Sequence, residues 1–216
     1  PARRRHSQSR GPYMIDLDIS GGVWTLTLNR PDKANSLTFE MLERIAEIAA
    51  DAKDARALII TGAGTVFSAG ADLSAAKAGL ATSDVWERVS GAIAALPGLT
   101  IAALNGTLAG GAFGMALACD IRLAVPTAKF FYPVMKLGFL PQPSDPVRMR
   151  ALIGPSRTKL ILMAGQKIRA DDALAFGLID RIVSIDDFHT TLETLTQDVI
   201  AASPQQIAGI KRLVDE

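Results

Sequence analysis

A stretch of apolar and small residues from Ile101 to Asp120 is interrupted by glycine at two places, and it reads IAALNGTLAGGAFGMALACD. A short apolar run ends at Asn105-Gly106, and the pair Gly110-Gly111 opens a helix of small residues. Glycine at a helix start lets a ligand approach bare backbone N–H groups. These groups and the helix dipole favour an anion, or an oxygen that becomes negative during a reaction. The stretch therefore predicts an anion or oxyanion site, but it contains no ionisable side chain between Asn105 and Cys119.

Charge is concentrated at the start of the chain. The formal net charge of the 216 residues is +1, and four arginines lie within residues 1–12. The remainder is therefore mildly acidic and lacks the basic surface that follows a nucleic acid backbone. We expect residues 1–12 to be a flexible basic tail or a leftover of recombinant expression. A nucleic-acid arm and a targeting sequence are the alternatives, although the segment has no apolar run.

The single cysteine, Cys119, is expected to be a small buried hydrophobe. One cysteine excludes a disulfide within the chain, which fits a reducing cytoplasm. The uncharged stretch Val89–Cys119 is long enough to span a bilayer. Because Pro97-Gly98 and the glycine pairs break it, we expect a buried strand, turn and helix and no membrane span.

Strand and helix patterns alternate along the chain, which predicts the α/β class with a loosely recurring unit of two strands and a helix. The expected strands are 15–19, 23–28, 57–61, 100–104, 120–124, 129–132 and 180–183, the first two forming a hairpin. The expected helices are 37–50, 74–96, 111–119, 156–163, 171–176, 187–201 and 204–214, and a glycine-containing loop covers residues 63–73.

Several glycine-rich motifs are excluded by single positions. A phosphate-binding Walker loop needs lysine where Ala112 stands, and a dinucleotide fingerprint needs glycine where Phe67 stands. A nucleophile elbow around Ser68 needs glycine where Val66 stands. The two histidines are His6 in the tail and His189 in a polar helix, so we expect no histidine metal site.

Two loops remain, 67–73 and 105–111, and each follows a buried strand. Each can offer a backbone N–H group to one oxygen. Tight turning and close packing of helix on strand are the alternative explanation for their glycines. Two such loops at this spacing favour a functional site.

The motifs resemble those of the enoyl-CoA hydratase/isomerase family, also called the crotonase superfamily, over about residues 15–183. The matching segments are Leu28-Asn29-Arg30-Pro31, Asn35-Ser36-Leu37, Phe67-Ser68-Ala69-Gly70-Ala71-Asp72-Leu73, Ala103-Leu104-Asn105-Gly106, Gly110-Gly111, Cys119-Asp120, Leu137-Gly138, Gly165-Gln166-Lys167-Ile168 and Ala173-Leu174-Ala175-Phe176-Gly177-Leu178-Ile179.

The resemblance implies a spiral of repeated ββα units, here residues 13–185, followed by C-terminal helices in 186–216. It implies an acyl-CoA thioester as ligand, coenzyme A as part of the substrate and no separate cofactor or metal, and a homotrimer or dimer of trimers. By residue matching, the N–H groups of Ala71 and Gly111 are the oxyanion hole that stabilises an enolate. The implied coenzyme A contacts are Ala34, Ser36, Leu37, Ala69, Asp72, Leu73 and Ser74.

The sequence departs from the family at all three usual carboxylate positions. Gly114 and Val134 stand where hydratases have glutamates, and Gln142 stands where some isomerases and a dehalogenase have an aspartate. Hydration needs one group to activate water and another to deliver a proton, and each positioned group contributes on the order of 10²–10⁴-fold. The departures therefore argue against efficient hydratase activity.

Asp145 is our candidate replacement acid, although an aspartate before proline is commonly a turn residue. Tyr132 either points into the pocket or packs in the core, and Asp84 and Glu87 are expected to be solvated.

Family members continue beyond the last helix seen here, so either the end is missing or the chain is a short form with a more open site. Two hypotheses follow: an acyl-CoA enzyme of the lyase or isomerase type with a nonstandard acid, and a non-catalytic acyl-CoA carrier or regulator. A binding module for another ligand is a third possibility.

Overall fold

A computed structural model describes residues 14–215, so the predicted tail and His6 lie outside the described residues. The larger sheet has six strands in the order β1-β2-β3-β5-β7-β10. Their bounds are β1 Ile15–Ser20, β2 Val23–Leu28, β3 Ala57–Gly62, β5 Leu99–Leu104, β7 Ile121–Ala124 and β10 Arg181–Ile182. β1 and β2 form the predicted antiparallel hairpin, and the other neighbours in this sheet are parallel.

The smaller sheet has the order β4-β6-β8-β9. Its strands are β4 Val66–Ser68, β6 Thr107–Ala109, β8 Lys129–Phe131 and β9 Ile168–Arg169. The strands β3, β5 and β7 of the larger sheet are each followed along the chain by β4, β6 and β8 of the smaller one. This repeated step from one sheet to the other, with a helix after each pair, confirms the predicted spiral of ββα units.

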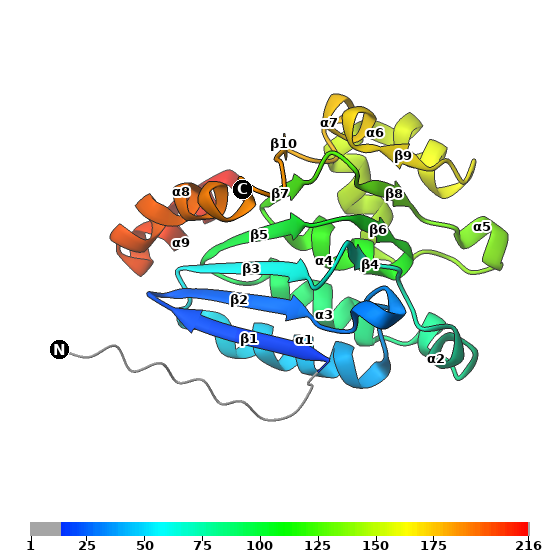
Figure 1. Ribbon diagram of the computed structural model, residues 1–216, viewed down its shortest axis with the longest axis horizontal. Coiled ribbons are helices and arrows are strands. Elements are labelled where there is room, and N and C mark those ends of the chain that lie inside the picture. The colour runs from blue at the N-terminus through cyan, green and yellow to red at the C-terminus, as the bar shows by residue number, and fades with distance from the viewer. Residues whose placement is uncertain (1–13, 216) are drawn as a thin grey trace.

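The helices lie around these two sheets (Figure 1). Their bounds are α1 Phe39–Asp51, α2 Leu73–Lys77, α3 Val85–Ala94, α4 Phe113–Ala118, α5 Val134–Leu137, α6 Ser144–Leu162, α7 Ala170–Phe176, α8 Phe188–Ala201 and α9 Pro204–Asp215. Figure 1 shows α1 and α3 side by side along the larger sheet, with α8 and α9 at the opposite end of the molecule from α2 and α5. The predicted division of the chain at 185/186 precedes α8 and stays a prediction.

The core explains why the central strands are continuous apolar runs. Residues 57–60 of β3 and 101–104 of β5 are buried on both faces, as expected for parallel strands that are covered on both sides. Helix α1 buries a stripe at helical spacing, made of Met41, Leu42, Ile45, Ile48 and Ala49. Its start is set by Thr38, whose hydroxyl accepts a hydrogen bond from the N–H group of Met41.

The prediction of one helix over residues 74–96 is wrong. The segment contains α2, a 3₁₀ helix (Leu80–Thr82) and α3. Gly79 lies between them with a φ of 104°, a conformation that glycine adopts readily and that cannot continue a helix. Short elements were also missed: β4, β6, β9, α5 and the first half of α6, whose path bends at Gly154.

Most of the uncharged stretch Val89–Cys119 is buried in the protein, while Ala94, Ala95 and Pro97 are exposed. Cys119 is a free, buried cysteine, as predicted, and burial raises the pKa of its thiol to about 12. Among residues 14–215, no helix has the length and apolar character needed to cross a membrane.

Gly106 is required by the close approach of two backbone segments. A Cβ atom at this position would lie 2.0 Å from the carbonyl oxygen of Thr65, which is backbone and cannot rotate away. Gly91 on α3 offers a matched contrast, because a Cβ atom there meets nothing within 4 Å. The turn after β5 is therefore in contact with the turn before β4.

We expect Gly106→Ala to lower the free energy of unfolding by about 3 kcal/mol or more, because the backbone must move to relieve the overlap. Gly91→Ala should raise it by about 0.5–1 kcal/mol, since alanine is the better helix former. Urea denaturation of both variants checks this pair. Equal stability of the two variants would contradict the close approach.

Candidate functional site

The two glycine-containing loops meet at Gly70 and Gly110. A Cβ atom on Gly70 would lie 2.8 Å from the carbonyl oxygen of Ala109 and 3.3 Å from the Cα atom of Gly110. Both glycines have positive φ angles, 88° and 56°. This contact brings the residues that follow, Ala71 and Gly111, to the same place, and both are partly exposed.

Within residues 14–215, the backbone hydrogen bonds at this place involve the neighbours of Ala71 and Gly111. Leu37 and Ala71 form a parallel bridge in which the N–H groups of Leu37 and Asp72 donate to Gly70 and Leu37, at 2.8 Å each. These two bonds do not use the N–H group of Ala71. Gly111 lies in a 3₁₀ turn that leads into α4, and the first N–H groups of a helix have no partner within it. The arrangement can therefore offer two donors to one oxygen.

Two buried asparagines hold the backbone around this place. The Asn35 side chain accepts from the Arg30 N–H group and donates to the carbonyls of Ala63 and Val66. Asn105 accepts from the N–H group of Gly62 at 3.0 Å and donates to the Gly64 carbonyl at 2.9 Å. Nothing in the local pattern predicted this role, because all partners except Arg30 lie in residues 62–66, far along the chain from both asparagines.

The residues matched to coenzyme A contacts cluster in two adjoining segments. Ala34, Ser36 and Leu37 lie on one of them, and Ala69, Asp72, Leu73 and Ser74 lie on the other. The segments are joined by the bond from the N–H group of Ala69 to the carbonyl of Ala34, at 2.9 Å. Leu73 is 77% exposed and available for a contact.

Asp72 has a structural task in addition to its matched position. Its carboxylate accepts from the N–H groups of Ser74 and Ala75 and so caps α2. The guanidinium of Arg30 donates to the same carboxylate at 2.8 Å and holds the pKa of Asp72 below its usual range. Arg30 also donates to the Ser36 carbonyl at 3.1 Å, which links both segments.

Asp145 lies against the backbone of Gly114, one helical turn after Gly111. Its Oδ1 atom is 3.1 Å from the position that a Cβ atom on Gly114 would take. Its Oδ2 atom accepts a hydrogen bond from the Tyr132 hydroxyl at 2.9 Å, while Oδ1 has no hydrogen-bond partner within residues 14–215. Asp145 is 0% exposed in the first turn of α6.

Burial is the main reason why the pKa of Asp145 is raised. Loss of solvent raises the pKa of Asp145 to about 7, opposed by the hydrogen bond from Tyr132 and supported by the charge of Glu87. Of the other two positions without a carboxylate, Val134 is buried and Gln142 donates to the carbonyl of Ala81 at 3.3 Å. A carboxyl group therefore lies beside the helix that follows Gly111, although it comes from another element.

The expectation that Glu87 is a solvated charge is wrong. Its Oε1 atom accepts from the N–H group of Ser144 at 3.1 Å and from the Ser144 hydroxyl at 2.9 Å. The ring of the preceding residue, Trp86, packs on Gly111, and a Cβ atom on Gly111 would lie 3.0 Å from this ring. Helix α3 thus touches both Gly111 and the start of α6.

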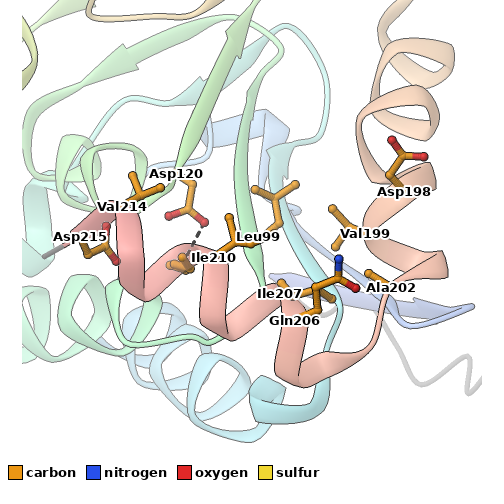
Figure 2. Close-up of a pocket in the computed structure, with 11 residues that line it drawn as sticks. Leu99, Asp120, Asp198, Val199, Ala202, Gln206, Ile207, Ile210, Val214 and Asp215 are labelled. Atoms are coloured by element: carbon orange, nitrogen blue, oxygen red, sulfur yellow. Dashed lines mark hydrogen bonds and ion pairs between the residues drawn. The ribbon is translucent and has the colours of Figure 1, made fainter.

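A separate cavity of about 370 Å³ lies between α8, α9 and the start of β5 (Figure 2). Figure 2 shows Leu99, the first residue of β5, facing side chains from both helices. The Nζ atom of Lys211 contacts the Oδ2 atom of Asp120 at 2.9 Å beside this cavity. The cavity lies at the start of β5, whereas the loop 105–111 follows the end of this strand, and no residue of either candidate loop lines the cavity. The cavity is therefore not part of the site.

Metal chemistry has no support in the described part of the chain. Within residues 14–215, no group of three or more His, Cys, Asp or Glu residues is placed to hold a metal ion. His189 is 85% exposed and pairs with Glu193 one helical turn away.

The chain is similar to known proteins over most of its length. Residues 18–216 match the family model described as enoyl-CoA hydratase/isomerase. A probable enoyl-CoA hydratase of Mycobacterium leprae is 31% identical over 209 residues, covering 94% of this chain and 83% of the relative. A carnitinyl-CoA dehydratase of Salmonella enteritidis is 33% identical over 210 residues, covering 92% and 79%. The crystal structure of an enoyl-CoA hydratase from Bacillus anthracis matches with a TM-score of 0.87 at 28% identity, covering 94% of this chain and 83% of that one.

Asp145 makes stability depend on pH in a defined direction. Between its ordinary pKa of 3.8 and about 7, the folded protein keeps a proton that the unfolded chain has released. The free energy of unfolding should therefore fall as pH rises through this window, by at most about 1.4 kcal/mol per pH unit. Asp145→Asn should lack this contribution.

Urea denaturation of the wild type and Asp145→Asn at pH 5 and pH 8 measures the effect. We expect the variant to gain stability relative to the wild type at pH 8. Parallel pH dependence of both proteins would show that Asp145 is ionised when folded.

Proposed function

Because the chain belongs to the enoyl-CoA hydratase/isomerase family, we propose that it binds an acyl-CoA thioester and stabilises the enolate of that thioester. The N–H groups of Ala71 and Gly111 receive the thioester oxygen. The supporting observation is the contact of Gly70 with Gly110, which brings two loops with available N–H groups together. Donors placed where negative charge develops lower the barrier to enolate formation.

Asp145 is the acid–base group in this proposal. Within residues 14–215, its Oδ1 atom is buried without a partner beside Gly114, and a buried polar atom without a partner is costly unless a ligand satisfies it. Burial raises the pKa of Asp145 to about 7, so both its protonated and its ionised form are populated at neutral pH and the group can both take and give a proton. Asp145 thus supplies from α6 the carboxyl group that α4 lacks at Gly114.

In this proposal, the acyl chain lies in an apolar cavity, some of whose lining residues are close in sequence to Tyr132 and Asp145. The cavity has a volume of about 440 Å³ and is lined in part by Val134, Pro141 and Pro146. Val134 follows Tyr132 by two positions, and Pro146 is the residue after Asp145. Apolar lining beside a few polar groups is typical of small-molecule sites, and it suits an aliphatic acyl group.

A non-catalytic acyl-CoA carrier or regulator is the second candidate. It is favoured by one observation, the 0% exposure of Asp145 together with non-ionisable residues at the three usual carboxylate positions. This candidate needs the same thioester site and no proton transfer. Turnover of a bound thioester separates the two.

We expect the purified protein to hydrate or isomerise a crotonyl-type thioester, and Asp145→Asn to lower kcat by about 10²–10⁴-fold. Binding of the thioester should be unchanged, because the variant keeps the size and the Tyr132 contact. Turnover is followed by the absorbance of the enoyl group, and binding by calorimetry. Asp84→Asn is the matched control, since Asp84 is an 83% exposed carboxylate. Binding without turnover in the wild type favours the carrier, and no binding rejects both candidates.

The oxyanion site itself is tested by the infrared carbonyl band of a ¹³C-labelled thioester. Two N–H donors polarise the carbonyl, so the band of the bound thioester should lie at lower wavenumber than that of the free one. An S-alkyl-CoA without the carbonyl should bind less tightly than the matching thioester. An unshifted band with equal affinities would contradict an oxyanion hole at Ala71 and Gly111.

A further inference from the structure

We propose that Tyr132 is the positioning residue of Asp145: its hydroxyl donates to Oδ2 and thereby keeps the transferable proton on Oδ1, the oxygen that faces Gly114. The inference rests on the proposed function, because it assigns a task only if Asp145 moves a proton. It adds a residue for which the sequence motifs supply no role. The argument depends on how the hydroxyl is held and on what surrounds the carboxyl group.

The Tyr132 ring is fixed by packing. Tyr132 follows β8 and is 4% exposed. Its ring stacks on Phe113 of α4 at a centroid distance of 5.5 Å and an interplanar angle of 18°. Burial and this stacking hold the side chain in place, so the hydroxyl has a defined position 2.9 Å from Oδ2 of Asp145.

The direction of the hydrogen bond follows from the neighbours of the hydroxyl. The backbone N–H group of Gln142 approaches the hydroxyl oxygen at 3.5 Å, and an N–H group can only donate. Within residues 14–215, the acceptor for the hydroxyl hydrogen is Oδ2 of Asp145. Burial and the nearby Asp145 raise the pKa of Tyr132 far above its ordinary value, so the phenol keeps its hydrogen and remains a donor.

A donor on Oδ2 decides where the carboxyl proton lies. A protonated carboxyl group has one carbonyl oxygen that accepts and one hydroxyl oxygen that donates. Since Oδ2 accepts from Tyr132, the proton belongs on Oδ1, which lies 3.1 Å from the Cβ position of Gly114. Delivery of this proton to a bound substrate leaves a carboxylate whose Oδ2 is still stabilised by the same hydroxyl.

Other charges near Asp145 do not make a hydrogen bond of this kind. Glu87 on α3 raises the pKa of Asp145, and Arg148 on α6 lowers it. Both side chains bond instead to Ser144, Glu87 accepting at 2.9 Å and Arg148 donating at 3.0 Å to its hydroxyl. Removal of the Tyr132 hydroxyl therefore removes the hydrogen bond that lowers the pKa of Asp145 and leaves these charges in place.

Tyr132→Phe tests the inference, because it keeps the stacked ring and removes one oxygen. Proteins labelled with ¹³C-aspartate are compared by infrared spectroscopy, and Asp145→Asn identifies the band of Asp145. In the protonated state, the carbonyl band should move to higher wavenumber in Tyr132→Phe, since its oxygen loses a donor. The pKa of Asp145 should rise by roughly 1–2 pH units. Phe113→Leu is the control, because it weakens the packing and keeps the hydroxyl.

A purely structural role predicts that Tyr132→Phe and Phe113→Leu both lower stability without this spectroscopic change. An unmoved carbonyl band or an unmoved pKa in Tyr132→Phe overturns the inference. With turnover in the wild type, the pH profile of kcat should shift upward in Tyr132→Phe by the same amount as the pKa, with KM unchanged. If the wild type or Asp145→Asn shows that Asp145 moves no proton, the proposed function fails, and the spectra still report separately whether Tyr132 directs the proton.

Discussion

The approach of two backbone segments at Gly70 and Gly110 is the constraint on which the site depends. A side chain on Gly70 would meet the carbonyl oxygen of Ala109 at 2.8 Å, so the loops can touch only where no Cβ atom stands. Gly106 allows a second such contact with Thr65. Backbone polar groups brought this close must be satisfied, and the buried side chains of Asn35 and Asn105 do this. The two loops that carry the proposed donors, Ala71 and Gly111, are thereby held in contact.

The carboxyl group beside these loops shows how a site can be assembled from distant elements. Gly114 on α4 leaves the space that Asp145 of α6 occupies, and Tyr132 after β8 contacts the same carboxyl group. Helix α3 joins them, because Trp86 packs on Gly111 and Glu87 binds Ser144. A change in any of these elements would alter the position or the charge of Asp145. A carboxyl group can therefore lie beside α4 although no residue of α4 supplies it.

Long and strongly periodic elements could be predicted from the sequence, and short ones could not. The hairpin and α1 carry a clear alternation or a clear helical stripe. Strands β4 and β6 have three residues each, too few for a period, and they exist because they pair with each other. The break at Gly79 was missed because glycine within a helical pattern is also tolerated without a break.

The sequence by itself determined the α/β class, the family and the two glycine loops, because these depend on local patterns and on residue types at fixed spacing. It also determined that the three usual carboxylate positions hold residues that cannot ionise, Gly114, Val134 and Gln142. Only the tertiary structure decided that Asp145 lies against Gly114, that Tyr132 binds it and that Glu87 is engaged with Ser144. Residues 114 and 145 come from two helices and residue 132 from the connection after β8, and no periodicity along a chain encodes which side chains meet when these segments pack. The pKa of Asp145 depends on that packing, since burial, more than any neighbour in sequence, raises it.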